Sequence, residues 1–148
     1  MFELHPRLSQ DTWPVGDLPL CRLLLMNDAS YPWFILVPRR SGIREIFELA
    51  HSDQQQLLKE SSQLAEVLSR IFKADKLNIA TLGNLVPQLH VHHIVRYQHD
   101  QAWPKPVWGL FPAAPYSSGA RQESCASLIE HLLDFTPHSS CAVRPGVC

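Results

Sequence analysis

The feature that most constrains the fold is residues 87–96, PQLHVHHIVR, where three of the chain's eight histidines fall within four positions. The run predicts a buried strand. Side chains alternate between the two faces of a strand, so Gln88, His90 and His92 share one face. The opposite face carries His93 among apolar residues. This pattern predicts the floor of a site laid over a hydrophobic core.

The rest of the chain predicts an α+β fold with an antiparallel sheet of about five strands, one long helix and a C-terminal helix. Two apolar runs, 21–26 and 33–37, flank a segment rich in turn formers and predict a hairpin. Residues 76–81 predict a further strand before the histidine run. Residues 1–19 contain Pro6, Pro14, Gly16 and Pro19 and are expected to be an irregular lead-in.

Apolar residues recur at three- and four-residue spacing after Ser52, which indicates the long helix. Ser52 is the expected N-cap, with Gln55 as its capping-box partner, and the helix is expected to end near Lys73. The C-terminal helix is expected at 123–135, and the segment 136–148 is expected to be a flexible tail.

With 148 residues, 45% of them hydrophobic, the chain is expected to form a single domain, 1–148, with its core at about 20–110. A net charge of -1 gives no global attraction for nucleic acid or anionic membranes, so neither partner is expected. Neither a signal-peptide pattern nor a membrane-spanning run is found, and the four scattered cysteines favour reduced thiols. The expected location is the cytoplasm.

Two imidazoles at alternate positions of a strand, roughly 6.5–7 Å apart at the backbone, can reach one ligand. Three roles are open for His90 and His92. They can be structural, they can bind zinc, or one can attack phosphorus as a neutral nucleophile. A zinc site needs a third ligand, and the nearest carboxylate in sequence is Asp100. Neither a metal nor a cofactor is expected.

Residues 83–94, GNLVPQLHVHHI, together with Asn78, resemble the signature of the histidine triad (HIT) superfamily, in which three histidines alternate with apolar residues after a glycine-containing turn. The Asn27-Asp28 turn, the strand end at 34–39 and the long helix follow in the order that the family shows. The resemblance covers about 20–96 and is greatest for the short bacterial branch whose motif begins with glutamine.

The resemblance implies an antiparallel α+β unit, usually a homodimer, that hydrolyses or transfers nucleoside monophosphate groups, so the expected partner is a nucleotide or nucleotidyl conjugate. By position, His90 matches the nucleophile and His92 matches the histidine that contacts phosphate oxygens. Gln88 stands where the first histidine normally lies and completes the set of candidate catalytic residues. Because a carboxamide does not titrate, any proton transfer by this position is lost or is carried out by another residue.

The resemblance also implies substrate-binding residues. Asn78 matches a polar residue near the phosphate, Asn27 or Asp28 matches the group that holds the ribose hydroxyls, and the turn at Gly83 and Asn84 offers amide and backbone donors.

Further departures from the family pattern and other charged or aromatic residues give additional expectations. Leu85 replaces the Ser or Thr of many nucleotide hydrolases of the family. His93 is expected to be a hydrogen-bonded core residue, and Arg96 a solvated strand-end charge. Trp103 and Trp108 are expected to pack in the core, to cover a base or to contact a partner subunit.

Three hypotheses follow. The leading one is a HIT-type enzyme that cleaves a phosphoramidate or phosphoanhydride bond through a nucleotidyl-His90 intermediate. The alternatives are a nucleotide-binding or dimeric interaction protein with little catalysis, and a zinc hydrolase.

Overall fold

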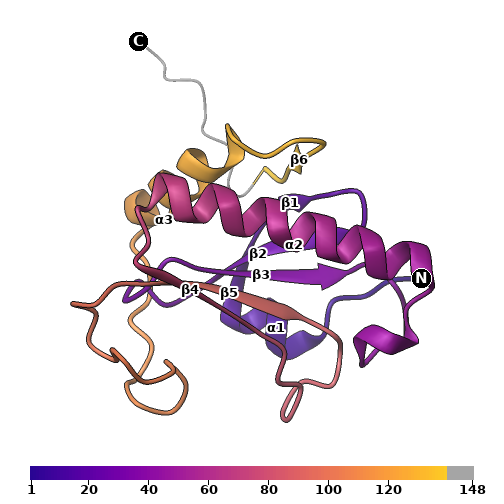
Figure 1. Cartoon of the computed structure of the whole chain (residues 1–148), viewed down its shortest axis with the longest axis horizontal. Coiled ribbons are helices and arrows are strands. Elements are labelled where there is room, and N and C mark those ends of the chain that lie inside the picture. Colours follow the sequence, from indigo (N-terminus) through magenta and orange to yellow (C-terminus); the bar gives the residue numbers. More distant parts are fainter. Residues whose placement is uncertain (140–148) are drawn as a thin grey trace.

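The computed structural model describes residues 1–139 and has an antiparallel sheet in the order β4-β5-β3-β2-β1-β6 (Figure 1). The elements are α1 (Pro6–Asp11), β1 (Thr12–Asp17), β2 (Cys21–Met26), β3 (Trp33–Pro38), the 3-10 helix η1 (Ile46–Glu48), α2 (His51–Ile71), β4 (Lys76–Ala80), β5 (Val91–Arg96), α3 (Ser118–Ile129) and β6 (Thr136–Pro137). The predicted α+β class is confirmed, with six strands in place of about five.

The predicted hairpin is confirmed as β2 and β3, which pair antiparallel from Cys21 opposite Pro38 to Leu25 opposite Phe34. The histidine strand, β5, begins at Val91 and lies between β3 and β4. Residues 81–90 therefore form the loop from β4 to β5, and His90 is the last loop residue before the strand.

The prediction of an irregular lead-in is wrong, because residues 6–17 form α1 and β1. Pro14 is tolerated in β1 because the register shifts between Pro14 and Gly16, and because β6 pairs only with Gly16 and Asp17 on the outer side. A proline lacks the N–H of a ladder and is accommodated at such bulges and edges. A Cβ at Gly16 would lie 2.2 Å from the Phe135 ring, so a glycine permits this close approach.

The long helix α2 begins at His51 with Ala50 as its N-cap, which makes no side-chain cap hydrogen bond, so the predicted Ser52 capping box is wrong. Its buried stripe includes Leu57, Leu64 and Leu68 as predicted, whereas Leu58 is 69% exposed. The stripe also contains Glu60, whose carboxylate accepts hydrogen bonds from the backbone N–H of Leu20 and Cys21 at 2.7 and 2.9 Å. A buried carboxylate held in this way ties α2 to the start of β2.

The C-terminal helix starts at Ser118, five residues before the predicted start, because the Ser117 side chain accepts a hydrogen bond from Ala120 N–H as its cap. The segment that was expected to be a tail begins with β6, and its residues 140–148 lie outside the described part of the chain. In residues 1–139, no helix is both long enough and apolar enough to cross a membrane.

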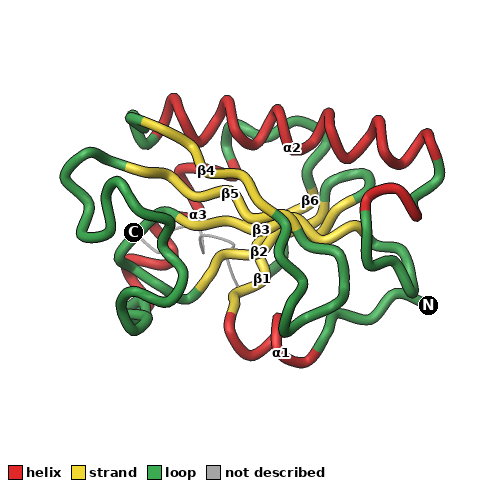
Figure 2. Tube along the Cα trace, turned by 60° about the horizontal axis from the view of Figure 1, so that its bottom comes forward, coloured by secondary structure: helices red, strands yellow, loops and turns green. Residues whose placement is uncertain are grey.

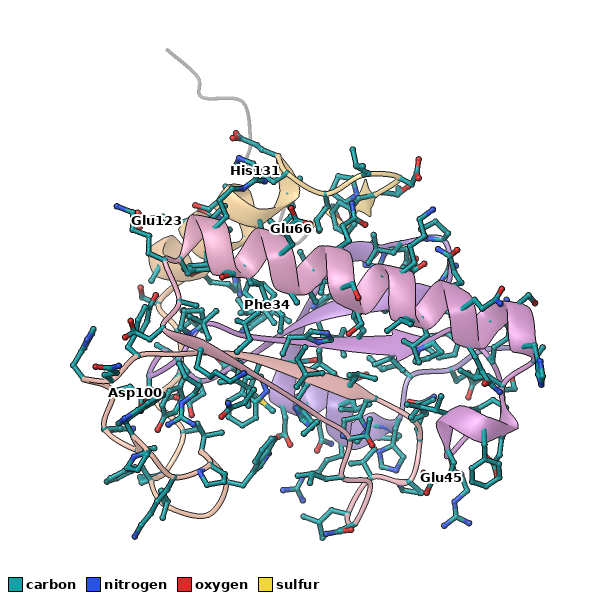
Figure 3. All side chains as sticks on the ribbon, viewed as in Figure 1. Phe34, Glu45, Glu66, Asp100, Glu123 and His131 are labelled. Atoms are coloured by element: carbon teal, nitrogen blue, oxygen red, sulfur yellow. The ribbon has the colours of Figure 1, made fainter. Side chains whose placement is uncertain are left out.

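The sheet separates two layers, and Figure 2 shows α2 along one face and α1 on the other. On the α2 face, residues such as Phe34, labelled beneath α2 in Figure 3, pack with Leu64 and with Cys125 of α3. On the α1 face, Leu8, Ile35 and Ile94 belong to a second apolar cluster. Both faces of β5 are therefore buried, and each covering layer sets the surroundings of the histidines that it contacts.

Candidate active site

His90 is held by the main chain two residues before it. Its Nδ1 lies 2.6 Å from the carbonyl oxygen of Gln88. A carbonyl can only accept a hydrogen bond, so in the neutral ring Nδ1 carries the proton and Nε2 has a free lone pair. Within the described part of the chain Nε2 has no hydrogen-bond partner, and His90 lines a pocket of about 330 Å³. The ring is therefore in the tautomer that a nucleophile requires.

His92 has the opposite tautomer. The indole N–H of Trp33 donates to its Nδ1 at 2.9 Å, and an indole N–H can only donate. The proton of the neutral ring is therefore on Nε2. The contact arises from strand register, because Ile35 of β3 pairs with His92 and Trp33 lies two residues away on the same face.

His92 is uncharged at neutral pH. Burial lowers its pKa to about 3, and the neighbouring imidazoles of His90 and His93 lower it further. The rings of His90 and His92 lie 4.9 Å apart, centroid to centroid. One free lone pair and one N–H donor therefore adjoin each other, an arrangement suited to nucleophilic attack at phosphorus with a donor for a phosphate oxygen.

The pocket that His90 and His92 line adjoins a second pocket. The pocket of about 330 Å³ is also lined by Gly83 and Asn84, so the structure brings these two predicted residues beside His90 and His92. Gly83 has a φ of 76°, in the left-handed region that favours glycine, and it turns the loop toward the pocket. Leu85 lies at the rim and is 81% exposed.

The second pocket, of about 540 Å³, contains the predicted ribose-binding residues Asn27 and Asp28. It shares four lining residues with the first pocket, namely Arg7, Asp11, Met26 and Trp108. Asp28 is anchored through Oδ1, which accepts from the backbone N–H of Ser30 and Ala114 at 3.0 and 3.2 Å. Asn27 accepts from Tyr116 N–H at 3.0 Å. These bonds hold the turn after β2 against residues 113–116.

Two predicted site residues have other partners. The Gln88 side chain lines neither of these two pockets, and its carboxamide bonds the main chain of Glu3 and His5. Asn78 shares the face of β4 and β5 that carries His92, but its Oδ1 accepts from Arg96 Nη1 at 2.8 Å. Asn78 lines neither pocket and supports a buried arginine instead.

The expectation that Arg96 is a solvated charge is wrong, because it is only 1% exposed. It forms a two-point ion pair with Asp100, labelled in Figure 3 on the loop after β5, at 2.8 and 3.0 Å. Its guanidinium also lies over the rings of Tyr31 and Trp103, at 5.9 and 5.7 Å from their centroids. Burial alone would raise the pKa of Asp100, but hydrogen bonds from Arg96 and the backbone hold it below the usual value.

The Asp100 carboxylate also accepts from two backbone N–H groups at the start of the loop that leads to Trp108, at 3.1 and 2.8 Å. The Trp108 ring lies 5.2 Å from His92 and 5.7 Å from Trp33, both in edge-on geometry. Trp33, Trp108 and Arg7 are site residues that sequence reasoning missed or left open. No local pattern marks them, because their positions depend on strand pairing and on loop packing.

His93 lies on the α2 face, as expected for a core histidine. Its Nε2 is 2.7 Å from the Ser61 hydroxyl of α2 and its Nδ1 is 3.1 Å from the Val91 carbonyl. Burial lowers its pKa to about 4, although the Val91 carbonyl opposes the shift. This ring does not contribute to the pockets described above.

The geometry does not favour the zinc hypothesis. In residues 1–139, no group of three or more His, Cys, Asp or Glu side chains is placed to hold a metal ion. The Nδ1 atoms of His90 and His92 are also engaged by Gln88 and Trp33.

Comparisons with known proteins agree on one family. The HIT domain family model matches residues 7–99. A histidine triad protein of known structure from Marinobacter aquaeolei is 54% identical, over 89% of this chain and 99% of that one, with a TM-score of 0.86. One from Bradyrhizobium japonicum is 47% identical, over 89% and 98%, with a TM-score of 0.88. No curated protein matches significantly.

A third structure, a histidine triad protein from Sinorhizobium meliloti, is 45% identical over 89% of this chain and 98% of that one, with a TM-score of 0.87. The resemblance drawn from the histidine motif is thus confirmed, and the family model extends it from about 20–96 to residues 7–99. The chain belongs to the histidine triad (HIT) family, which implies an activity of the nucleotide-binding hydrolase or transferase kind.

Proposed function

We propose that the protein cleaves a phosphoramidate or phosphoanhydride bond to a nucleoside monophosphate through a nucleotidyl-His90 intermediate. The lone pair of His90 Nε2 attacks phosphorus and forms a P–N bond. The bond to the leaving nitrogen or oxygen breaks, and the leaving group keeps the electron pair and takes a proton from solvent. Water then attacks phosphorus, the P–N bond breaks, and the water proton passes to solvent.

The observation that carries this proposal is the pair of opposite tautomers. In the neutral rings, the Gln88 carbonyl, 2.6 Å from His90 Nδ1, favours a lone pair on His90 Nε2, and the Trp33 indole, 2.9 Å from His92 Nδ1, favours a proton on His92 Nε2. The first ring supplies the nucleophile. The second supplies a neutral donor for a phosphate oxygen at the point where negative charge develops.

The two pockets divide the ligand between them. We place the phosphate in the pocket of about 330 Å³ beside Asn84, and the nucleoside in the pocket of about 540 Å³ beside Asp28. The shared wall at Met26 and Trp108 allows one ligand to occupy both. Asp28 Oδ1 is already engaged with backbone N–H groups, so we assign Oδ2 to the ribose hydroxyls.

The test follows AMP release from an adenylyl-lysine phosphoramidate and from a dinucleoside polyphosphate. We expect turnover by the wild type and a loss on the order of a thousandfold or more in His90→Ala. His131→Ala is the matched control, because His131 is an exposed histidine on the segment after α3. Full activity in His90→Ala would overturn the mechanism, and no turnover by the wild type on either substrate would overturn the enzyme class.

A second candidate is nucleotide binding with little catalysis. It is favoured by Gln88, whose carboxamide cannot titrate and is occupied by the main chain, and by Leu85, which offers no hydroxyl at the pocket rim. Calorimetry with AMP separates the two functions. Binding of AMP without turnover of the matching substrates would support this candidate against the enzyme.

We also propose that the protein is a homodimer formed through β4. This strand is an outer strand of the sheet in the described chain. A groove of about 590 Å³ beside it is lined by apolar side chains that include Ile46, Leu58 and Ile79, which are 44%, 69% and 49% exposed. Antiparallel pairing of β4 with a second β4 about a two-fold axis would satisfy the strand edge and cover this groove.

Sedimentation velocity tests the dimer. We expect a dimer for the wild type and a monomer for Leu58→Glu. Leu133→Glu is the matched control, because Leu133 is 72% exposed and lines no part of the groove. A monomeric wild type would refute the dimer.

We further propose a cytoplasmic location, since nucleotidyl conjugates are made there. Cell fractionation tests this proposal.

A further inference from the structure

Gln88 uses both polar atoms of its side chain to hold another segment of the chain. Its Oε1 accepts from the backbone N–H of His5 at 2.9 Å, and its Nε2 donates to the carbonyl of Glu3 at 2.8 Å. A carboxamide presents an acceptor and a donor side by side, and these match the N–H and C=O that residues 3 and 5 direct to one side. Gln88 is therefore a two-point clamp on the main chain.

The clamped segment, residues 1–11, leads directly into the wall of the site. The side chain of His5 accepts a hydrogen bond from the backbone N–H of Arg7 at 3.1 Å and so starts α1. Arg7, Leu8 and Asp11 of α1 line the pocket that contains His90 and His92. The position of Arg7 thus depends on the chain that Gln88 holds two residues earlier.

Arg7 has a charge that the site otherwise lacks. Among the described residues that line the two pockets, it is the only arginine or lysine, and it lies with the carboxylates Asp11 and Asp28. His92 is neutral, since burial lowers its pKa to about 3. Within the described chain, a nucleotide phosphate would therefore enter two pockets whose only permanent positive charge comes from Arg7.

Arg7 is also free to change partners. Its pair with Asp11, at 3.0 Å, has side chains that are 59% and 48% exposed, and exposed pairs of this kind contribute little to stability. A phosphate brings a larger negative charge and a geometry that suits a guanidinium.

We propose that residues 1–11 form one side of the ligand site and that Arg7 binds a phosphate group of the ligand. Gln88 is the positioning residue that holds this segment in place. The inference rests on the proposed nucleotide ligand and names a contact that the mechanism at His90 does not require. It also gives Gln88 a role that a non-titrating side chain can perform.

The first test compares AMP with adenosine by calorimetry in wild type and Arg7→Ala. We expect about fivefold weaker AMP binding in the variant, unchanged adenosine binding, and a smaller difference at high salt. Arg40→Ala is the matched control, because Arg40 is an exposed arginine paired with Asp53 and lines neither pocket. Equal AMP affinity in Arg7→Ala and Arg40→Ala would overturn the proposal. If the wild type binds neither ligand, the proposed function itself fails.

The second test measures hydrogen exchange at the His5 backbone N–H by NMR, which requires no activity. We expect protection to decrease from wild type to Gln88→Glu, which keeps an acceptor for His5, and further to Gln88→Met, which keeps neither bond. AMP affinity should fall in the same order. Unchanged His5 protection in Gln88→Met would show that the clamp is unimportant.

A double variant shows whether Gln88 acts through Arg7. If it does, Gln88→Met combined with Arg7→Ala will bind AMP no more weakly than the weaker single variant, because both remove the same contact. Losses that multiply would mean that Gln88 acts independently of Arg7, and they would overturn its assignment as the positioning residue.

Discussion

The tautomer of His92 can be tested by removing its partner in Trp33→Phe. The substitution deletes the indole N–H that lies 2.9 Å from His92 Nδ1 and keeps an aromatic ring in β3. Trp33 is 6% and His92 4% exposed, so water does not replace the lost donor easily. The Nδ1 lone pair is then unpaired, or the proton moves to Nδ1 and leaves Nε2 without it.

The expected cost combines two effects. An unpaired buried acceptor costs about 1–3 kcal/mol. The smaller ring leaves a partial cavity beside Trp108, which adds about 1 kcal/mol. We therefore expect the free energy of unfolding to fall by about 3 kcal/mol. Because the donor at His92 Nε2 is no longer fixed, kcat/KM for a nucleotidyl substrate should fall roughly tenfold.

The assay is ¹⁵N NMR of the imidazole nitrogens, together with chemical denaturation. The wild type should show His92 protonated at Nε2 only, and Trp33→Phe should show a mixture of tautomers. Trp13→Phe is the control for ring size, because Trp13 Nε1 is buried without a partner in the described chain. It should cost less than about 1 kcal/mol, because removal of the unpaired buried N–H offsets the lost ring contacts. A wild-type His92 protonated at Nδ1 would refute the reasoning, as would equal destabilisation by the two variants.

Three further predictions concern the buried polar groups. The pKa values of His92 and His93, about 3 and 4, lie below 6.5, so the unfolded chain binds more protons in acid and stability present above pH 6.5 is lost as the pH falls. Denaturation curves should show a loss of about 3 kcal/mol from pH 6.5 to 5, and about half of it in His93→Gln. Asp100→Ala leaves Arg96 buried without its anion and should cost about 3–5 kcal/mol in chemical denaturation. Arg7→Ala, which breaks the exposed pair with Asp11, should cost about 0.5 kcal/mol in the same measurement. Ser61→Ala should lower the free energy of unfolding by about 1 kcal/mol and leave turnover unchanged, because in the described chain the Ser61 hydroxyl bonds only His93.

Local patterns were sufficient for the elements whose residues interact with near neighbours. The hairpin was predictable because two apolar runs flank a turn, and the faces of β5 followed from simple alternation. Gly83 and Asn84 were expected in the site from the resemblance to the HIT signature, and they line the pocket that contains His90. These predictions required no knowledge of which strands pair.

Contacts between distant segments were not predictable in this way. Trp33 and His92 are 59 residues apart, and Gln88 and His5 are 83 apart, so each pair depends on the sheet order or on the path of α1. Strand β1 was not predicted because it contains Pro14, which the chain accommodates at a bulge.

Two charged residues were also unexpected in the core. Glu60 and Arg96 were missed as buried residues because charged side chains are rarely buried unless they are paired, and their partners come from other elements. The structure supplies those partners, and the sequence pattern does not.

His90 and His93 show why the motif alone cannot assign the nucleophile. Each ring directs Nδ1 at the carbonyl two residues earlier, Gln88 for His90 and Val91 for His93, so both have a proton on Nδ1 and a lone pair on Nε2. They differ in the surroundings of the Nε2 lone pair. In His93 this lone pair accepts a hydrogen bond from the Ser61 hydroxyl on α2, whereas His90 lines a pocket. The main chain therefore sets the tautomer, and the layer over each face of the sheet determines which ring is available to react.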